Sequence, residues 1–199
     1  MVKIALFGTS ADPPTSGHQA IISWLSKHYD WVAVWAADNP FKSHQTHLSH
    51  RVAMLRLLIE DIPHQQNICL HSELSSYKTI ETLETAKQLW GADADFTLVI
   101  GSDLVNQLPR WYRVEDLLRQ VQLLVVQRPG YEIEDADLQQ LRQLGAKVAI
   151  ADLTGPQVSS TAYRKNKDTQ ALTPPIQAYI HREHLYKCED KLKEKLQIR

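Results

Sequence analysis

The sequence lacks most features of secreted, disulfide-rich or membrane-spanning proteins. It has only two cysteines, Cys69 and Cys188, far apart in the chain, so nothing requires an oxidising compartment. Cys69 lies in an apolar run, and we expect it to be a small buried hydrophobe. No apolar run approaches membrane-spanning length, and the first eight residues are too short for a signal segment. These absences predict a soluble, cytoplasmic protein that does not bind membranes.

An excess of charge of either sign is also missing. The 22 lysines and arginines nearly balance the 23 aspartates and glutamates, and the formal net charge is -1. This balance argues against nucleic-acid binding through global charge, although it leaves room for a local basic pocket that binds phosphates. A chain of 199 residues, 43% of them hydrophobic, is long enough to bury a real core in one domain.

Short apolar runs alternate with longer helix-like segments, without internal repeats or linkers. The predicted strands cover residues 2–7, 31–36, 67–71, 96–100, 121–126 and 147–151. The predicted helices cover residues 17–29, 49–61, 79–90, 115–120 and 134–144, and further helices begin near residue 160 and after residues 174–175. This alternation predicts an α/β domain over residues 1–186, with a Rossmann-like parallel sheet, helices on both faces and a helical C-terminal part. Residues 187–199 alternate in charge and are predicted to form a charged helical tail.

Two short motifs stand far apart in the chain, Thr15-Ser16-Gly17-His18 near the start and Ser159-Ser160-Thr161-Ala162-Tyr163-Arg164 near the end. Each would place hydroxyls, free backbone N–H groups and one cationic or proton-bearing side chain at the start of a helix, as polyphosphate binding requires. Thr15 and His18 are three residues apart, which puts them on one face of a helical turn. Gly17 would let the backbone come close to a ligand. Because ligands of parallel sheets bind outside the carboxyl ends of the strands, both motifs should meet at that edge and hold one nucleoside triphosphate.

Plainer interpretations of the same residues stay open. Gly17-His18 fits an ordinary tight turn with a solvated histidine, and Ser159 to Thr161 fit a helix N-cap. Asp103 fits a helix cap after Gly101, and Trp111 fits a core or lid aromatic. The histidines at every third position, His44, His47 and His50, fit a polar loop running into a helix better than a metal site, because no carboxylate or cysteine set accompanies them.

The other common phosphate loops, G-x-x-x-x-G-K-[ST] and G-x-G-x-x-G, are missing. With its two motifs, the sequence resembles the nucleotidylyltransferases that carry His/Thr-x-Gly-His near the N-terminus and Ile/Val-Ser-Ser-Thr-x-x-Arg near the C-terminus. Within that superfamily it most resembles the nicotinate mononucleotide adenylyltransferases. The likeness covers residues 8–18, Pro40 with Lys42, 51–58, 79–83, 100–103, 108–112, 128–130, 158–164, 179–180 and 185–186.

The resemblance implies an enzyme of NAD biosynthesis. The phosphate of nicotinate mononucleotide would attack the α-phosphorus of ATP in line, releasing pyrophosphate and forming deamido-NAD without a covalent enzyme intermediate. Mg²⁺ would be bound through the ATP phosphates, and no metal site of the protein itself is predicted. The alternatives are the same transfer to nicotinamide mononucleotide or to another phosphorylated acceptor such as phosphopantetheine, and a nucleotide-binding protein without catalysis. A homo-oligomer stays open.

The resemblance also implies roles for individual residues. His18 would contact the α-phosphate, Arg164 would bind the departing pyrophosphate, and Thr15 and Lys42 would contact phosphates as further catalytic residues. The implied ATP-binding residues are Gly8, Thr9, Ser10, Gly17, Gly101, Asp103, Ser159, Ser160 and Thr161, of which Gly101 and Asp103 would hold the ribose. The implied substrate-binding residues are Thr79, Trp111, Tyr112 and Arg128, with Trp111 stacked on the pyridine ring.

The sequence departs from the family pattern at four places, one of which is the segment Pro40-Phe41-Lys42, shorter than the usual Pro-Pro-His-Lys. The usual Gly-Gly-Thr-Phe-Asp-Pro is replaced by Gly8-Thr9-Ser10-Ala11-Asp12-Pro13, and Thr15 stands where the family usually has histidine. The segment 76–83 holds one extra residue, and Lys78 in it would favour a pyridine acid over the amide. The changes at Thr9, Ala11 and Thr15 are the reason for keeping the non-catalytic alternative.

Overall fold

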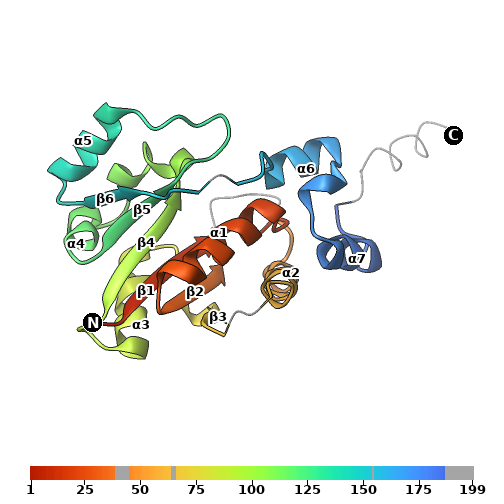
Figure 1. Cartoon of the computed structure of the whole chain (residues 1–199), viewed down its shortest axis with the longest axis horizontal. Coiled ribbons are helices and arrows are strands. Elements are labelled where there is room, and N and C mark those ends of the chain that lie inside the picture. Colours follow the sequence, from red (N-terminus) through yellow and green to blue (C-terminus); the bar gives the residue numbers. More distant parts are fainter. Residues whose placement is uncertain (39–44, 64–65, 154, 187–199) are drawn as a thin grey trace, which may run out of the picture.

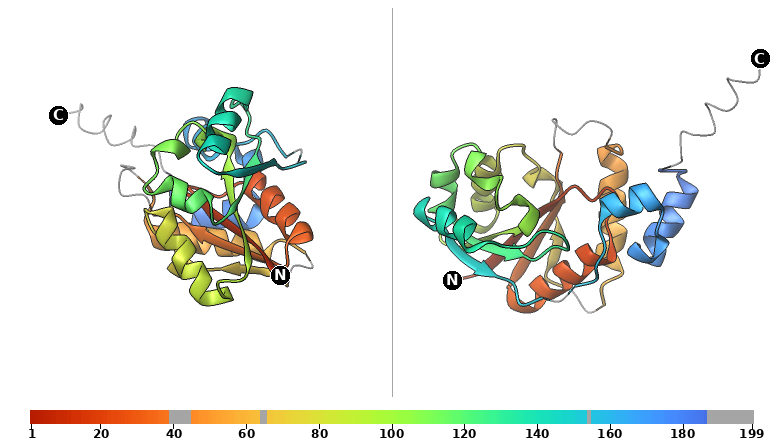
Figure 2. Two further views of the ribbon diagram at one scale, coloured as in Figure 1. Left: turned by 90° about the vertical axis from the view of Figure 1, so that its left-hand side faces the viewer. Right: turned by 90° about the horizontal axis from the view of Figure 1, so that it is seen from above.

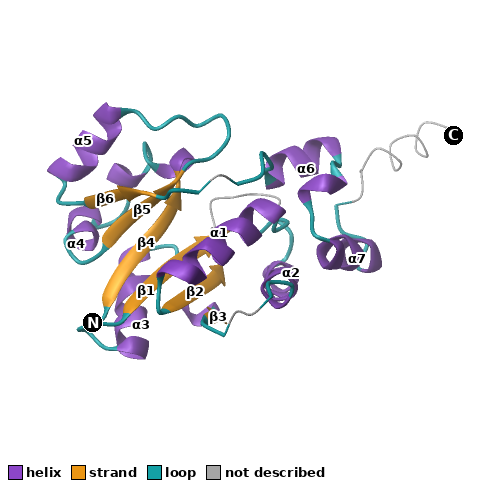
Figure 3. Cartoon of the chain, viewed as in Figure 1, coloured by secondary structure: helices purple, strands orange, loops and turns teal. Residues whose placement is uncertain are grey.

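Strands and helices alternate along the chain, as Figure 3 shows. The computed structural model describes residues 1–38, 45–63, 66–153 and 155–186 (Figure 1). In this part of the chain the strands are β1 (Lys3–Thr9), β2 (Trp31–Ala36), β3 (Ile68–Leu70), β4 (Asp95–Gly101), β5 (Gln122–Val126) and β6 (Lys147–Ile150). The α-helices are α1 (Ser16–His28), α2 (Leu48–Glu60), α3 (Thr79–Trp90), α4 (Val114–Leu118), α5 (Asp135–Gln143), α6 (Ser160–Asn166) and α7 (Pro174–Arg182). Short 3₁₀ helices are η1 (Ser72–Leu74), η2 (Ser102–Leu104), η3 (Leu108–Arg110) and η4 (Thr169–Ala171).

The strands form one parallel sheet in the order β3-β2-β1-β4-β5-β6. β1 therefore lies in the middle, paired with β2 on one side and β4 on the other. The chain crosses back over the sheet after β3 to begin β4, so the strand order reverses between β1 and β4. The crevice outside the carboxyl ends of these two strands is the place where such sheets bind ligands.

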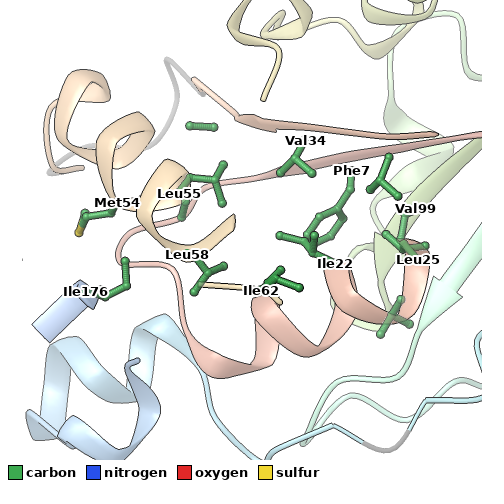
Figure 4. Packing of buried hydrophobic residues seen from close by; sticks show 14 of the residues in the cluster. Phe7, Ile22, Leu25, Val34, Met54, Leu55, Leu58, Ile62, Val99 and Ile176 are labelled. Atoms are coloured by element: carbon green, nitrogen blue, oxygen red, sulfur yellow. The ribbon is translucent and has the colours of Figure 1, made fainter. Parts of the chain in front are cut away.

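The two faces of the sheet carry separate buried clusters, because successive side chains of a strand point to opposite faces. On one face, Phe7 packs with Ile22 of α1 and Leu55 of α2 (Figure 4). On the other face, Leu6 packs with residues of α3 and α4, including Leu83 of α3. Helices thus cover both faces of the sheet, as the alternating pattern predicts.

The last helices continue the first cluster beyond the sheet. Ile176 of α7 lies beside Met54 of α2 in the same buried cluster (Figure 4). Figure 2 shows α6 and α7 together at one end of the molecule, far from the N-terminus. The C-terminal part is therefore anchored to the α/β core by apolar packing on α2.

The predicted fold class is confirmed, and each predicted strand and helix occurs with boundaries that differ by at most two residues. The prediction for Cys69 is wrong in degree: the side chain is only half-buried, because β3 is an edge strand with one open side. The predicted tail, residues 187–199, lies outside the described residues. In the described part of the chain, no helix combines the length and the apolar character needed to cross a membrane.

Candidate active site

A cavity of about 1130 Å³ lies at the carboxyl edge of the sheet, where the strand order reverses. All predicted site residues that the structure describes line this cavity, with the exception of Ser159. They are Gly8, Thr9, Ser10, Thr15, Gly17, His18, Thr79, Gly101, Asp103, Trp111, Tyr112, Arg128, Ser160, Thr161 and Arg164. Lys42 lies outside the described residues. The two sequence motifs therefore meet at one cavity, as predicted.

The N-terminal motif begins α1 and places Thr15 against His18. Thr15 is the N-cap residue and is only 1% exposed. Its backbone N–H donates to Nδ1 of His18 over 3.0 Å, and its Oγ1 lies 2.8 Å from the same nitrogen. The predicted closeness of hydroxyl and imidazole is confirmed. Thr15 holds the imidazole in place, while a contact between Thr15 and a triphosphate stays a prediction.

This contact decides which nitrogen of His18 carries the proton. A backbone N–H can only donate, so Nδ1 accepts and the ring proton resides on Nε2. Nε2 has no partner among the described residues, and the ring lines the cavity. Burial, together with the charge of Arg128, lowers the pKa of His18 from 6.5 to about 4. At neutral pH the side chain is therefore a neutral N–H donor.

Ser159 is the N-cap residue of α6. Its Oγ accepts the backbone N–H of Ala162 over 3.1 Å, which satisfies a free donor of the first turn. Ser159 does not line the cavity. The N-cap interpretation is thus the one that this geometry supports, and the predicted phosphate contact of Ser159 gains no support from it.

The other residues of the C-terminal motif tie α6 to the loop between β1 and α1. The hydroxyl of Ser160 donates to the carbonyl of Pro13 over 2.8 Å, across 147 residues of sequence. Nη1 of Arg164 donates to the carbonyl of Asp12, and Nη2 donates to Oγ1 of Thr161 over 3.3 Å. Arg164 keeps 39% of its side chain exposed and lines the cavity, so the guanidinium stays accessible to an anion.

Two glycines allow close packing around this loop. A Cβ added at Gly8 would lie 2.5 Å from the indole ring of Trp35, so the end of β1 can approach β2 only without a side chain there. A Cβ at Gly17 would lie 3.3 Å from Cγ2 of Val158. The close neighbour of Gly17 in this structure is therefore the loop before α6, and its predicted approach to a ligand stays a prediction.

Asp103 and Arg128 face each other across the carboxyl ends of β4 and β5. Nη1 of Arg128 lies 2.9 Å from Oδ2 of Asp103. A Cβ added at Gly101 would collide with both side chains, which explains glycine at that position. Within the described residues, Oδ1 of Asp103 is buried and has no hydrogen-bond partner. The carboxylate does not cap a helix; it has one free acceptor, which suits a sugar hydroxyl.

The segment with the extra residue forms another wall of the cavity. Nζ of Lys78 lies 2.9 Å from Oε1 of Glu81 and 5.1 Å from the ring centres of both Tyr77 and Tyr112. The hydrogen bond to Glu81 raises the pKa of Lys78, which favours the charged ammonium. That charge lies within cation–π distance of both rings. Thr79 follows directly as the first residue of α3.

Trp111 fits two interpretations at once, since it lines the cavity and packs against the second buried cluster. It directly follows η3, so its backbone is held by a short, ordered turn. A ring fixed on one side and open on the other can stack on a flat ligand.

Sequence reasoning missed the part played by Arg51. Its side chain is only 1% exposed, and its donors reach the carbonyls of Thr46, Ser10 and Ala37 over 2.9, 3.0 and 2.7 Å. Nη2 also lies 3.0 Å from Oδ1 of Asp38. Arg51 therefore holds two loops that line the cavity. A signal was present, because Arg51 shares the apolar face of α2, where a charged residue needs buried partners.

The two described histidines of the series have ordinary hydrogen-bond partners. Nδ1 of His47, the N-cap residue of α2, lies 2.8 Å from Oγ of Ser49. Nδ1 of His50 lies 2.9 Å from the hydroxyl of Tyr179. His44 lies outside the described residues. Across the described ranges, no group of three or more His, Cys, Asp or Glu side chains is arranged to hold a metal ion.

Comparison with known proteins places the chain in a family. The cytidylyltransferase-like family model matches residues 6–166. The "Probable nicotinate-nucleotide adenylyltransferase" of Synechocystis sp. is 44% identical, covering 94% of this chain and all of the relative. Nicotinate-nucleotide adenylyltransferase of Bacillus subtilis is 30% identical, covering 94% of this chain and 99% of the relative.

A solved structure shows the same fold. It is the structure of Plasmodium falciparum nicotinic acid mononucleotide adenylyltransferase complexed with NaAD. The match covers 94% of this chain and 98% of the Plasmodium chain, with a TM-score of 0.81 and 22% sequence identity. The family model, the two relatives and the shared fold agree with the residues gathered at the cavity. The chain belongs to the cytidylyltransferase-like family and, within it, to the nicotinate-nucleotide adenylyltransferases.

Proposed function

We propose that this protein joins the adenylyl group of ATP to nicotinate mononucleotide, which forms deamido-NAD and releases pyrophosphate. The observation that carries the proposal is the meeting of the two motifs. His18 at the start of α1 and Arg164 in α6 line one cavity, and the hydrogen bond from Ser160 to Pro13 ties their loops together. The names of the relatives support the choice of pyridine nucleotide.

The reaction needs positioning and charge stabilisation more than an activated side chain, because the attacking phosphate is already an anion. An oxygen of the mononucleotide phosphate forms a bond to the α-phosphorus of ATP. The bond from that phosphorus to the bridging oxygen breaks, and its electron pair leaves with pyrophosphate. His18 suits the centre of this transfer, since its neutral ring would present Nε2–H to an α-phosphate oxygen. Thr15 fixes the ring for that contact.

The leaving group would be bound at the start of α6. Arg164 offers a planar, permanently charged fork, and the hydroxyl of Thr161 lies beside it. Mg²⁺ would be carried by the ATP phosphates, whose charge it offsets. Lys42 remains a further candidate for a phosphate contact.

The other wall of the cavity would bind the sugar and the acceptor. The unpartnered Oδ1 of Asp103 would accept from the ATP ribose, beside Gly101. Trp111 would stack on the pyridine ring, and Thr79 with the backbone near Tyr112 would bind its carboxylate. Arg128, paired with Asp103, completes the candidate substrate contacts.

The test is pyrophosphate release by the purified protein with ATP and Mg²⁺, offered nicotinate mononucleotide and nicotinamide mononucleotide in parallel. We expect strong release with the acid and weak release with the amide. The variant His18→Ala is the matched control, because it removes the donor at the reacting centre. Its turnover should fall by roughly 10²-fold or more, while ATP affinity changes little, since the contact strengthens in the transition state.

Each other outcome changes a different part of the proposal. Preference for the amide would leave adenylyl transfer as the reaction. It would mean that the segment around Lys78 selects nicotinamide mononucleotide instead of the acid. Release with neither acceptor, despite ATP binding, would overturn adenylyl transfer to a pyridine nucleotide and favour another acceptor or a nucleotide-binding role. Unchanged turnover of His18→Ala would remove His18 from the mechanism.

A further inference from the structure

The last described residue of the chain, Tyr186, reaches back to the loop that lines the cavity between β1 and α1. Its hydroxyl donates to Oδ1 of Asp12 over 2.6 Å, across 174 residues of sequence. Asp12 is 3% exposed, so its carboxylate is a buried charge that needs partners. The contact therefore joins the C-terminal segment to the loop that carries the first motif.

Tyr186 is also held through its ring and its backbone carbonyl. Its ring meets the ring of Tyr163 in α6 edge to face, with centroids 5.8 Å apart. Nζ of Lys167 donates to its backbone carbonyl over 2.7 Å. Burial and the hydrogen bond to Asp12 raise the pKa of the Tyr186 phenol, so it stays protonated and donates at neutral pH. A side chain fixed at three points can in turn fix the carboxylate that it contacts.

Asp12 is also the residue that holds Arg164. Nη1 of Arg164 donates to the backbone carbonyl of Asp12 and lies 4.0 Å from Oδ2 of the same residue. The two carboxylate oxygens of Asp12 thus face different neighbours, Tyr186 at Oδ1 and Arg164 at Oδ2. Without the Tyr186 hydroxyl, the carboxylate would be free to turn toward Arg164 and compete with an anionic ligand for the guanidinium.

We propose that Tyr186 is a positioning residue for triphosphate binding, which acts by holding Asp12 so that Arg164 stays directed at the phosphates of ATP. This inference rests on the proposed function of the cavity. It adds to that function a contribution from the C-terminal segment, beyond both sequence motifs. Tyr186 itself does not line the cavity. It would therefore position the segment 8–15 and α6 from outside the cavity.

The test compares Tyr186→Phe with Tyr179→Phe in the full chain. Tyr179 is the matched control: it is 9% exposed, and its hydroxyl bonds His50, away from the cavity. Tyr186→Phe should raise the Kd for ATP roughly tenfold, as expected for loss of a hydrogen bond to a charged group. It should also speed amide hydrogen exchange in the segment 8–15. Tyr179→Phe should change the Kd less than about twofold, even where it lowers Tm equally.

A second pair of variants tests the route through Arg164. In an Arg164→Ala background, Tyr186→Phe should change the Kd for ATP by less than about twofold, because its effect needs the guanidinium. If the increases in Kd caused by Tyr186→Phe and by Arg164→Ala simply multiplied in the double variant, the route through Arg164 would be overturned. An unchanged Kd and unchanged exchange in Tyr186→Phe, or an equal rise in Kd for Tyr179→Phe, would overturn the positioning role. ATP binding and exchange need no turnover, so failure of this inference is distinct from failure of adenylyl transfer, which the unmodified protein tests.

Discussion

At the scale of single residues, the chemistry of the cavity depends on how neighbours set the state of His18. Burial is the larger influence that disfavours a second ring proton, and the positive charge of Arg128 adds to it. Thr15 donates to Nδ1, which places the one ring proton on Nε2. The result is a neutral donor whose free N–H points away from its own helix cap, which suits contact with a phosphate oxygen.

The low pKa of His18 predicts how stability changes with pH. The folded-state pKa of about 4 lies below the ordinary 6.5, so the unfolded chain takes up the proton first. The stabilisation from a neutral His18 is complete above pH 6.5 and is lost as the pH falls toward 4. Urea unfolding should show this as a slope of at most about 1.4 kcal/mol per pH unit. His18→Gln should remove that slope, and an equal slope in both proteins would contradict the assignment.

Arg128 supplies the second part of this shift, and a pair of arginine variants isolates it. Arg128→Gln should raise the pKa of His18, which should still stay below 6.5 because burial is the larger cause. Arg110→Gln is the control, since Arg110 lines the same cavity but does not contribute to the shift. Titration of the His18 ring by NMR measures its pKa in both variants. An unmoved pKa in Arg128→Gln would show that burial alone sets it.

Local spacing predicted part of the site at this scale, and distant partners account for the rest. The three-residue separation of Thr15 and His18 was enough to predict that both lie on one face of a helical turn. The division between Ser159, which caps α6, and Ser160, which bonds Pro13, depends on where the loop between β1 and α1 lies. A contact across 147 residues leaves no trace in the local pattern.

At the scale of elements, hydrophobic periodicity predicted the strands and helices. Strands that are covered on both faces of a parallel sheet are continuous apolar runs, whereas amphipathic helices have apolar residues at every third or fourth position. The 3₁₀ helices η2 and η3 went unpredicted. They hold only a single turn each, too short for any period, yet they carry Asp103 and lead into Trp111. The parts of the site on loops were therefore harder to predict than those at helix starts.

The packing of β1 against β2 gives a prediction for Gly8. Gly8→Ala would place a Cβ 2.5 Å from the ring of Trp35, which is 5% exposed and has little room to move. Overpacking of this kind costs about 1–3 kcal/mol. Thermal unfolding followed by circular dichroism should show a Tm lower by several degrees, roughly 2–4 °C per kcal/mol.

Gly155→Ala is the control for this prediction. Gly155 also lines the cavity, but a Cβ there has no neighbour within 4 Å. Its Tm should stay close to that of the unmodified protein. If Gly8→Ala had the same Tm as Gly155→Ala, the ring of Trp35 would be able to move aside at little cost. The tight packing at the end of β1 would then not be needed to shape the cavity.

At the scale of the whole molecule, the alternating pattern predicted a parallel sheet with its ligands at the carboxyl edge, but not the strand order. That order depends on which apolar faces the helices cover, and it is what brings the end of β1 beside the end of β4. Arg51 is a further feature of this scale, since α2, the loop after β1 and the end of β2 all meet at its side chain.

Arg51 therefore gives a prediction for the stability of the molecule. Arg51→Met keeps the length of the side chain but removes the donors of three backbone carbonyls in a site that is 1% exposed. Loss of the donor to a buried acceptor costs about 1–3 kcal/mol, and these three carbonyls are partly buried, so the free energy of unfolding should fall by about 3 kcal/mol. Urea unfolding should show a lower midpoint with an unchanged slope.

Two further variants separate the shape of the guanidinium from its charge. Arg56→Met removes an exposed arginine from the same helix and should change the free energy of unfolding by less than about 0.5 kcal/mol. Arg51→Lys keeps the charge, but one ammonium cannot replace a fork that reaches three carbonyls and Asp38. It should therefore lose nearly as much stability as Arg51→Met. Full stability of Arg51→Lys would mean that charge alone suffices, and that the loops around the cavity do not depend on the geometry of this side chain.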